Sequence, residues 1–167
     1  MSIHLDSPIS KTSWSLYWHP TEGRDWSLPS FTHFGTMKTW REFHTILDAL
    51  KVSTLSDGMF FLMRDPIPPL WENSQNIYGG AYSFRIPKAV AGEGFIHYGI
   101  AAILGTVMTS SANTINGLSI SPKKHYNIVK VWNTDAGKFK RPDDLLCLIP
   151  EVKTPEVQYK AFTDMKM

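Results

Sequence analysis

This 167-residue sequence has a single cysteine and almost no excess of charge. One cysteine, Cys147, excludes an intramolecular disulfide and a cysteine-rich zinc site, as is typical of a reducing compartment. The 17 Lys and Arg residues against 15 Asp and Glu leave a formal net charge of +2. This is too little for a protein that binds nucleic acid through charge alone. The length suits one domain, and 43% hydrophobic residues argue against disorder.

Long apolar runs and catalytic signatures are also missing. The longest apolar stretch, residues 94–108, contains His97 and is shorter than the roughly 20 residues that a membrane span needs. Residues 1–10 contain Asp6 and Pro8 and no apolar run, so no secretory signal is expected. The 6 histidines lack metal-ligand spacing, and there is no glycine-rich phosphate loop or nucleophile elbow. We therefore expect a cytoplasmic protein that is not an enzyme and uses no cofactor, metal or membrane.

Aromatic residues, by contrast, are abundant, at 13% with 6 tryptophans. Trp14, Trp18 and Trp40 lie in a predicted strand or on an apolar helix face and are interpreted as core. Trp26 and Trp71 lie among prolines, glycines and polar residues, where core packing explains them less well. Two exposed rings on separate loops can form a clamp for a flat base, with about 1–3 kcal/mol from each stacked base.

The periodicity of apolar residues predicts a single α+β domain over residues 1–167, with a flexible segment at 1–10. A helix is expected after an N-cap at Thr36, a second over 93–108, and a short third one beginning at Pro142. The first helix should bury one face, formed by Met37, Trp40, Phe43, Leu47 and Leu50. Strands are expected at 13–18, 31–35, 58–63, 81–86, 115–121, 128–134 and 156–162. Seven or eight strands in an antiparallel sheet with helices on one face follow from this order.

The long loop predicted over residues 64–80 carries the most informative chemistry. Glu72 directly follows Trp71, and a carboxylate beside a stacking ring suits guanine, which presents two hydrogen-bond donors on one edge. Lys123 and Lys124 lie in a predicted hairpin turn and can bind phosphates. Singly, these are an ordinary loop carboxylate and an ordinary charged turn. Together they predict a guanine and phosphate site.

The densest pattern in the sequence runs along this same loop. It comprises Pro69-Leu70-Trp71-Glu72-Asn73, then Asn76, then Gly79-Gly80-Ala81-Tyr82. This run resembles the Pro-x-Trp-Glu-Asp, Asn and Gly-Gly-x-Trp pattern of the eukaryotic translation initiation factor 4E family, which binds the 7-methylguanosine cap of mRNA. The likeness covers about residues 7–162, with weaker matches at 13–17, 25–26, 34–37, 116–117 and 128–134.

The resemblance implies a curved antiparallel sheet of about eight strands, with three helices on its convex face and the cap on the concave side. By the same match, Trp26 and Trp71 sandwich the methylated base, Glu72 binds the guanine edge, Trp132 contacts the methyl group and Lys123 meets the phosphates. Methylation makes the base cationic, and a cation between two indole rings gains about 2 kcal/mol when desolvated.

Phosphate binding is where the sequence departs from the family. Ala81 stands where the family has a phosphate-binding Arg, and the position of the family's last phosphate-binding Lys falls near Ile128 in an alignment without gaps. Lys124 or Lys130 can replace these residues, and for Lys130 this depends on which face of its strand it occupies. The sequence also ends soon after its last predicted strand, without the family's long C-terminal segment.

The expected partner surface departs further. The family docks the Tyr-x-x-x-x-Leu-hydrophobic peptide of the 4G scaffold on an exposed Trp of the first helix, and here Arg41 occupies that position. The predicted partner-binding residues are Pro8, Met37, Arg41, His97, Tyr98 and Ala101. These changes are either neutral drift on a solvent face or a docking surface rebuilt for a different partner.

Three functions are therefore considered. The first is a protein that binds capped mRNA and recruits it for translation initiation through a 4G-like scaffold or another protein on the convex helical face. The second is a cap-binding repressor or competitor that does not bind the usual scaffold. The third is an interaction module of this fold that no longer binds nucleotide.

Overall fold

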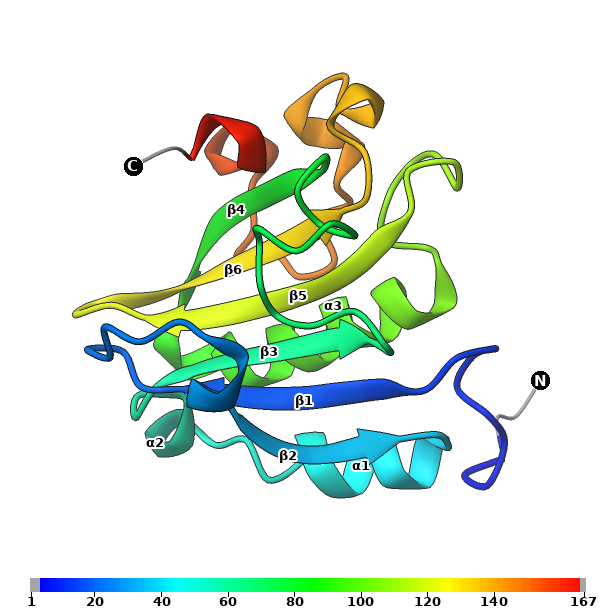
Figure 1. Ribbon diagram of the computed structural model, residues 1–167, viewed down its shortest axis with the longest axis vertical. Coiled ribbons are helices and arrows are strands. Elements are labelled where there is room, and N and C mark those ends of the chain that lie inside the picture. The colour runs from blue at the N-terminus through cyan, green and yellow to red at the C-terminus, as the bar shows by residue number, and fades with distance from the viewer. Residues whose placement is uncertain (1–3, 166–167) are drawn as a thin grey trace.

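The computed structural model describes residues 4–165 and contains a seven-stranded antiparallel sheet (Figure 1). The spatial order of the strands is β2-β1-β3-β5-β6-β4-β7. The strands are β1 (Trp14–His19), β2 (Thr32–Met37), β3 (Met59–Arg64), β4 (Gly80–Pro87), β5 (Ile115–Pro122), β6 (Tyr126–Asn133) and β7 (Gln158–Ala161). The predicted fold class is confirmed, with seven strands in the described residues where about eight were expected.

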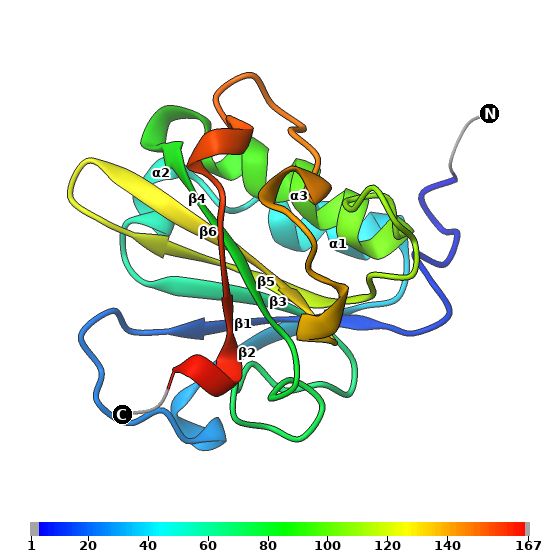
Figure 2. The same cartoon turned by 90° about the horizontal axis from the view of Figure 1, so that it is seen from above.

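Three helices cover one face of this sheet, and Figure 2 shows them together on the side opposite the loop of residues 64–80. They are α1 (Trp40–Leu47), α2 (Val52–Leu55) and α3 (Ala91–Leu104). Gly105 ends α3 in the left-handed conformation, with φ at 73°, which a residue without a Cβ adopts at little cost. We call the face under the helices the convex face and the opposite one the concave face.

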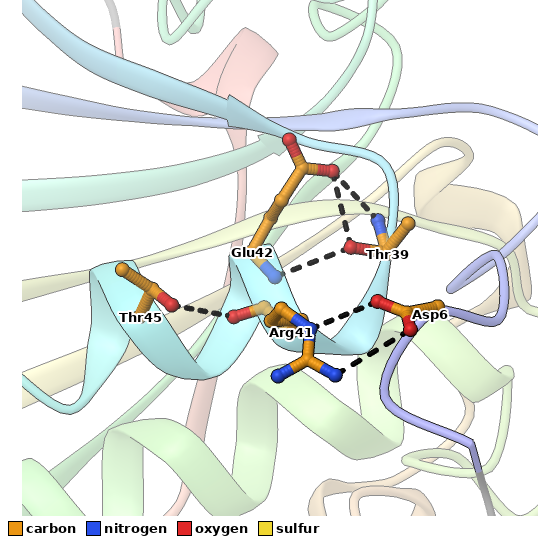
Figure 3. Close-up of polar contacts among 5 residues, drawn as sticks. All are labelled: Asp6, Thr39, Arg41, Glu42 and Thr45. Carbon is orange, nitrogen blue, oxygen red and sulfur yellow. Dashed lines mark hydrogen bonds and ion pairs between the residues drawn. The ribbon is translucent and has the colours of Figure 1, made fainter.

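The start of α1 corrects a sequence prediction. The N-cap is Thr39, three residues after Thr36, and Thr39 and Glu42 form a reciprocal capping box (Figure 3). Thr36 and Met37 belong instead to the end of β2, where Met37 is fully buried. The apolar spacing of Trp40, Phe43 and Leu47 belongs to the helix, but Met37 continues the same spacing from inside the strand.

The third predicted helix is also corrected. Residues Pro142–Asp144 form a single 3-10 turn, with Arg141 paired to Asp143 at 2.9 Å. The α-helix that the sequence pattern does not predict is α2. It has only 4 residues, which is too short for apolar residues to show a helical period.

Alternation along the strands divides the buried residues into two clusters. The larger cluster lies between the sheet and the helices and includes Trp14, Leu16, Phe43, Phe84 and Phe95. The smaller one lies on the concave face and is made by Phe31, Phe61, Met63, Ile67, Ala81, Trp132 and Phe162. Because neighbouring residues in a strand point to opposite faces, membership of these clusters fixes the direction of every side chain between them.

The N-terminal segment is attached to α1 over most of its described length. The Trp40 and Arg41 N–H groups donate to the carbonyl oxygens of Ser7 and Leu5, and Ile9 N–H donates to Lys38. The predicted flexible segment 1–10 is therefore hydrogen bonded from residue 5 onward, and its residues 1–3 lie outside the described ones. No helix in the described part of the chain is long and apolar enough to cross a membrane.

Candidate functional site

The strand register brings the predicted site residues onto the concave face. One row of directly paired residues crosses all seven strands. In spatial order it consists of Thr36, Ser15, Met63, Gly117, Trp132, Ala81 and Lys160. The next row contains Tyr17, Phe61, Ser119, Lys130, Ser83 and Gln158. Residues paired in this way share a face, so Lys130 lies on the same face as Trp132.

A chain of aromatic contacts links the two loop tryptophans across this face. Trp26 contacts Phe31 at 6.1 Å between ring centroids, Phe31 contacts Phe61 at 5.3 Å, and Phe61 contacts Trp132 at 6.2 Å. Phe162 then contacts Trp132 at 5.2 Å and Trp71 at 6.5 Å. Trp26 and Trp71 therefore lie at opposite ends of one aromatic surface.

Trp26 is stacked on His19. The two rings are 3.8 Å apart and inclined by 7°, and Trp26 is 42% exposed. His19 is fully buried, and its Nδ1 and Nε2 lie 2.8 and 2.6 Å from the carbonyl oxygens of Pro20 and Asp25. Because carbonyl oxygens only accept, the ring N–H of His19 is the donor in this contact. His19 thereby closes the loop 20–25 and supports the back of Trp26, whose other face stays available.

Replacing His19 with Leu should loosen this loop. The substitution His19→Leu removes the ring nitrogens that face the carbonyl oxygens of Pro20 and Asp25. Pro20 O keeps the bond from Gly23 N–H, whereas Asp25 O loses its side-chain partner, so the free energy of unfolding should fall by about 1–3 kcal/mol. Urea unfolding followed by tryptophan fluorescence measures it. His97→Gln, at an exposed histidine on α3, is the control and should change stability by less than about 0.5 kcal/mol. Equal effects of the two substitutions would contradict the role of His19.

The loop that carries Trp71 and Glu72 is held by buried amides. Asn76 is fully buried and donates to the carbonyl oxygens of Pro68 and Leu70, at 3.0 and 2.8 Å. Asn116 of β5 donates to Asn76 Oδ1 at 3.0 Å and to the Gln75 carbonyl at 2.9 Å. Two asparagines thus fix the backbone on both sides of Trp71.

The end of this loop needs two glycines. A Cβ on Gly79 would collide with the Asn133 carbonyl, and one on Gly80 would collide with Lys160 O and the Tyr159 hydroxyl. The Gly79-Gly80 pair therefore reflects the close approach of the loop to β6 and β7.

Trp71 is half-buried and Glu72 is exposed, so both can contact a ligand. Trp132 is only 5% exposed, packed between Phe61 and Phe162, and its Nε1 is 3.4 Å from Ser119 Oγ. The predicted methyl contact therefore has only the small exposed part of the Trp132 ring available.

The predicted phosphate-binding lysines lie at the turn between β5 and β6. Lys123 and Lys124 are both exposed there. Lys123 lines a groove of about 490 Å³ together with Pro20, Thr21 and Glu22, so the turn adjoins the loop that leads to Trp26.

The predicted partner surface is reduced by burial. Met37 and Tyr98 are fully buried and Ala101 is 7% exposed, so these three are corrected to core residues. The Tyr98 hydroxyl donates to the Leu146 carbonyl at 2.7 Å, and burial raises its pKa to about 12. Pro8, Arg41 and His97 remain on the surface.

Arg41 is engaged by the chain itself. Its Nε lies 2.8 Å from Asp6 Oδ1, and Figure 3 shows the guanidinium turned toward the N-terminal segment. The hydrogen bond from Arg41 lowers the pKa of Asp6. A separate groove of about 460 Å³ between the segment that follows α1 and the helix α3 is lined by Leu50, Ile96 and His97, among others.

The sequence pattern does not predict five residues that the structure places at the site: His19, Phe31, Phe61, Phe162 and Lys160. The alternation of Trp14, Leu16 and Trp18 toward the core places His19 on the opposite face, so the strand pattern held a signal for it. Lys160 could not be found in this way, because only the pairing of β7 with β4 brings it opposite Ala81.

Comparison with known proteins identifies the family. The family model described as "Eukaryotic initiation factor 4E" matches residues 10–165. This chain belongs to the eukaryotic initiation factor 4E family. The family is one of translation initiation factors and not of enzymes, in agreement with the absence of catalytic motifs from the sequence.

Among relatives of this family, eukaryotic translation initiation factor 4E of Candida albicans is 25% identical over 134 residues, which is 78% of this chain. The chain spans 61% of that relative's length. The initiation factor NCBP of Arabidopsis thaliana is 33% identical over 81 residues. These residues make up 48% of this chain and 35% of the length of that relative.

Solved structures of the family share the fold. A complex of C. elegans eIF4E-3 with the 4E-binding protein Mextli and a cap analog matches with a TM-score of 0.74 and 16% identity, covering 95% of this chain and 94% of that one. Ascaris suum eIF4E-3 with m7G cap matches with a TM-score of 0.63 and 18% identity, covering 80% and 76%.

Proposed function

We propose that this protein binds the 7-methylguanosine cap of mRNA on its concave face and recruits the mRNA for translation initiation. The observation that carries the proposal is the aromatic surface from Trp26 to Trp71, with the exposed Glu72 at its end. Membership of the initiation factor 4E family and the cap complexes of similar structures support it.

In the proposed complex the methylated base stacks on the face of Trp26 that His19 does not cover and on the ring of Trp71. Because these rings lie at opposite ends of the aromatic surface, one or both of their loops must close over the base. The loop of Trp71 is tied down by Asn76, and Trp26 is stacked on His19, whose ring contacts the carbonyl oxygens of Pro20 and Asp25. Closure over the base therefore requires at least one of these two attachments to adjust.

Glu72 accepts the two donors on the guanine edge in this proposal. The positive charge of a methylated base strengthens both the stacking and the hydrogen bonds to a carboxylate. Unmethylated guanine lacks that charge, so the site should select methylated guanine through electrostatics with little change of shape.

The test is a titration of tryptophan fluorescence with 7-methyl-GTP and, in parallel, with GTP. Strong quenching by the methylated nucleotide with at least about tenfold weaker binding of GTP is expected, equivalent to about 1.4 kcal/mol. Equal and feeble responses to both nucleotides would refute cap binding and favour an interaction module that has kept the fold.

The convex face is proposed as the docking surface for a scaffold protein, centred on Pro8, Arg41 and His97. A similar structure holds the 4E-binding protein Mextli. The Arg41–Asp6 pair and the burial of Met37 and Tyr98 favour a partner other than the usual 4G peptide. A pull-down with that peptide separates an initiation factor of the usual kind from a cap-binding repressor, which should not retain it.

A further inference from the structure

A cavity of about 390 Å³ lies on the helix side of the sheet, away from the aromatic surface. It is bounded by the ends of β3 and α3, by residues 10–12 and by residues 107–115. Its walls include Trp14, Ile103 and Met108, which are buried members of the larger core cluster. A hollow of this volume with a largely apolar wall is typical of a site for a small molecule.

Arg64 brings a positive charge to this cavity. It is the last residue of β3, and because Met63 points to the concave face, Arg64 points to the helix side. Its guanidinium lies over the ring of Trp14, 5.5 Å from the centroid. Among its nitrogens, Nε alone is enclosed without a hydrogen-bond partner in the described residues, so the terminal nitrogens remain accessible. Burial lowers the pKa of Arg64, but a guanidinium keeps its proton at neutral pH.

No carboxylate of the described chain neutralises this charge. The cavity lining contains no Asp or Glu, and its second cation is the exposed Lys11. Neither Arg64 nor Lys11 forms an ion pair within residues 4–165. The adjacent Asp65 is engaged elsewhere, because its carboxylate accepts from the hydroxyls of Ser13 and Ser15 at 2.6 and 2.7 Å. A partly desolvated charge without a counterion destabilises the protein, and a bound anion removes that cost.

We propose that this cavity binds a small organic carboxylate, with its carboxylate group on the terminal nitrogens of Arg64 and its hydrocarbon body against the apolar wall. The two terminal nitrogens of a guanidinium offer parallel N–H donors that match the two oxygens of a carboxylate. The stack on Trp14 holds the guanidinium in place. Ile103 and Met108 offer contacts that stabilise a hydrocarbon and that a strongly hydrated inorganic anion does not use. The inference is independent of cap binding, because the cavity and the aromatic surface lie on opposite faces of the sheet.

The test titrates the protein with hexanoate and 3-phenylpropionate, and in parallel with hexanamide and 3-phenylpropionamide. Methyl NMR of methionine gives the location, since Met108 lines the cavity and Met59 packs on the concave face. The variant Met108→Leu assigns the first signal. We expect the acids to shift the Met108 signal and to leave the Met59 signal in place. The amides have the same body without the charge, and should bind at least about tenfold more weakly.

Arg64→Gln should weaken hexanoate binding at least about tenfold, and Arg64→Lys, which keeps a charge but not the paired donors, should weaken it less. Arg85→Gln is the matched control. Arg85 is an exposed arginine of β4 that also lies over an aromatic ring, that of Tyr126 at 4.6 Å, and it does not line the cavity. Its substitution should change hexanoate affinity by less than about twofold. Hexanoate should raise the thermal unfolding midpoint of the wild type and not that of Arg64→Gln, since only the former binds it.

Three results would overturn the carboxylate site. Equal affinities for hexanoate and hexanamide, or an unchanged affinity in Arg64→Gln, would show that the cavity takes apolar molecules without using the charge. A shift of Met59 in place of Met108, with displacement of the acid by 7-methyl-GTP, would put the acid on the concave face. A lower unfolding midpoint in Arg64→Gln, with no acid shifting Met108 in the wild type, would show that the guanidinium serves only to pack on Trp14. None of these results bears on cap binding, which is measured with the nucleotide alone.

Discussion

Trp71→Ala should weaken binding of 7-methyl-GTP by about tenfold to a hundredfold, because a stacked base gains about 1–3 kcal/mol from its aromatic partner. The substitution removes one end of the aromatic surface but leaves the loop fixed by Asn76. Fluorescence titration measures the affinity, and the thermal unfolding midpoint checks that the fold is kept. Trp71 is half-buried against Phe162, so a modest loss of stability is expected.

Tyr78→Ala is the matched control for this experiment. Tyr78 is an aromatic residue at the end of the same loop, is 72% exposed and has no aromatic partner among the described residues. Its removal should leave cap affinity unchanged within about twofold.

Glu72→Gln should weaken 7-methyl-GTP binding about tenfold, because a neutral amide replaces a charged acceptor. If Trp71→Ala changes the affinity by less than about threefold, the base binds elsewhere.

Asn76→Ala should cause the largest loss of stability, with the free energy of unfolding reduced by about 2–4 kcal/mol. The carbonyl groups of Pro68 and Leu70 lose a donor, Asn116 Nδ2 loses an acceptor, and each buried group left without a partner costs about 1–3 kcal/mol. Leu70 O keeps the bond from Asn73 N–H, which places the sum below the maximum. Urea unfolding measures the change, with Gln75→Ala at an exposed neighbour as the control.

The same substitution should also change the site. With Asn76 gone, the loop around Trp71 gains freedom, so binding of 7-methyl-GTP must order it again and the affinity should fall. Amide hydrogen exchange over residues 68–78 should accelerate before the rest of the protein opens. Unchanged exchange in this loop would show that the Gly79-Gly80 end holds the loop without Asn76.

Much of the fold can be predicted from the sequence, because the patterns of apolar residues that indicate strands and helices lie within short segments. Alternation predicted the strands around Trp14 and Trp132, and a short apolar run predicted the strand around Phe61. The spacing of Trp40, Phe43 and Leu47 predicted the buried face of α1. The errors also have physical causes. The start of α1 was placed early because Met37 fits the helical spacing from inside β2, and α2 was missed because 4 residues carry no period.

The predicted docking residues Tyr98 and Ala101 show which features the local sequence pattern does not determine. Tyr98 and Ala101 lie one helical turn apart on α3, whose residues are apolar on most sides, so the spacing did not tell the buried face from the exposed one. Packing against residues 146–148 decided it, because the Tyr98 hydroxyl finds both of its partners there, about 50 residues away along the chain.

By itself, the sequence determined the family, the fold class and the loop that carries Trp71 and Glu72, because these depend on residue types at short, fixed spacing. Only the tertiary structure decided that Trp26 stacks on His19, that Tyr98 belongs to the core, and that Lys130 and Lys160 share the face of Trp132. These facts depend on which strands pair and in what register, and shifting the register by one residue would turn every side chain of a strand to the other face.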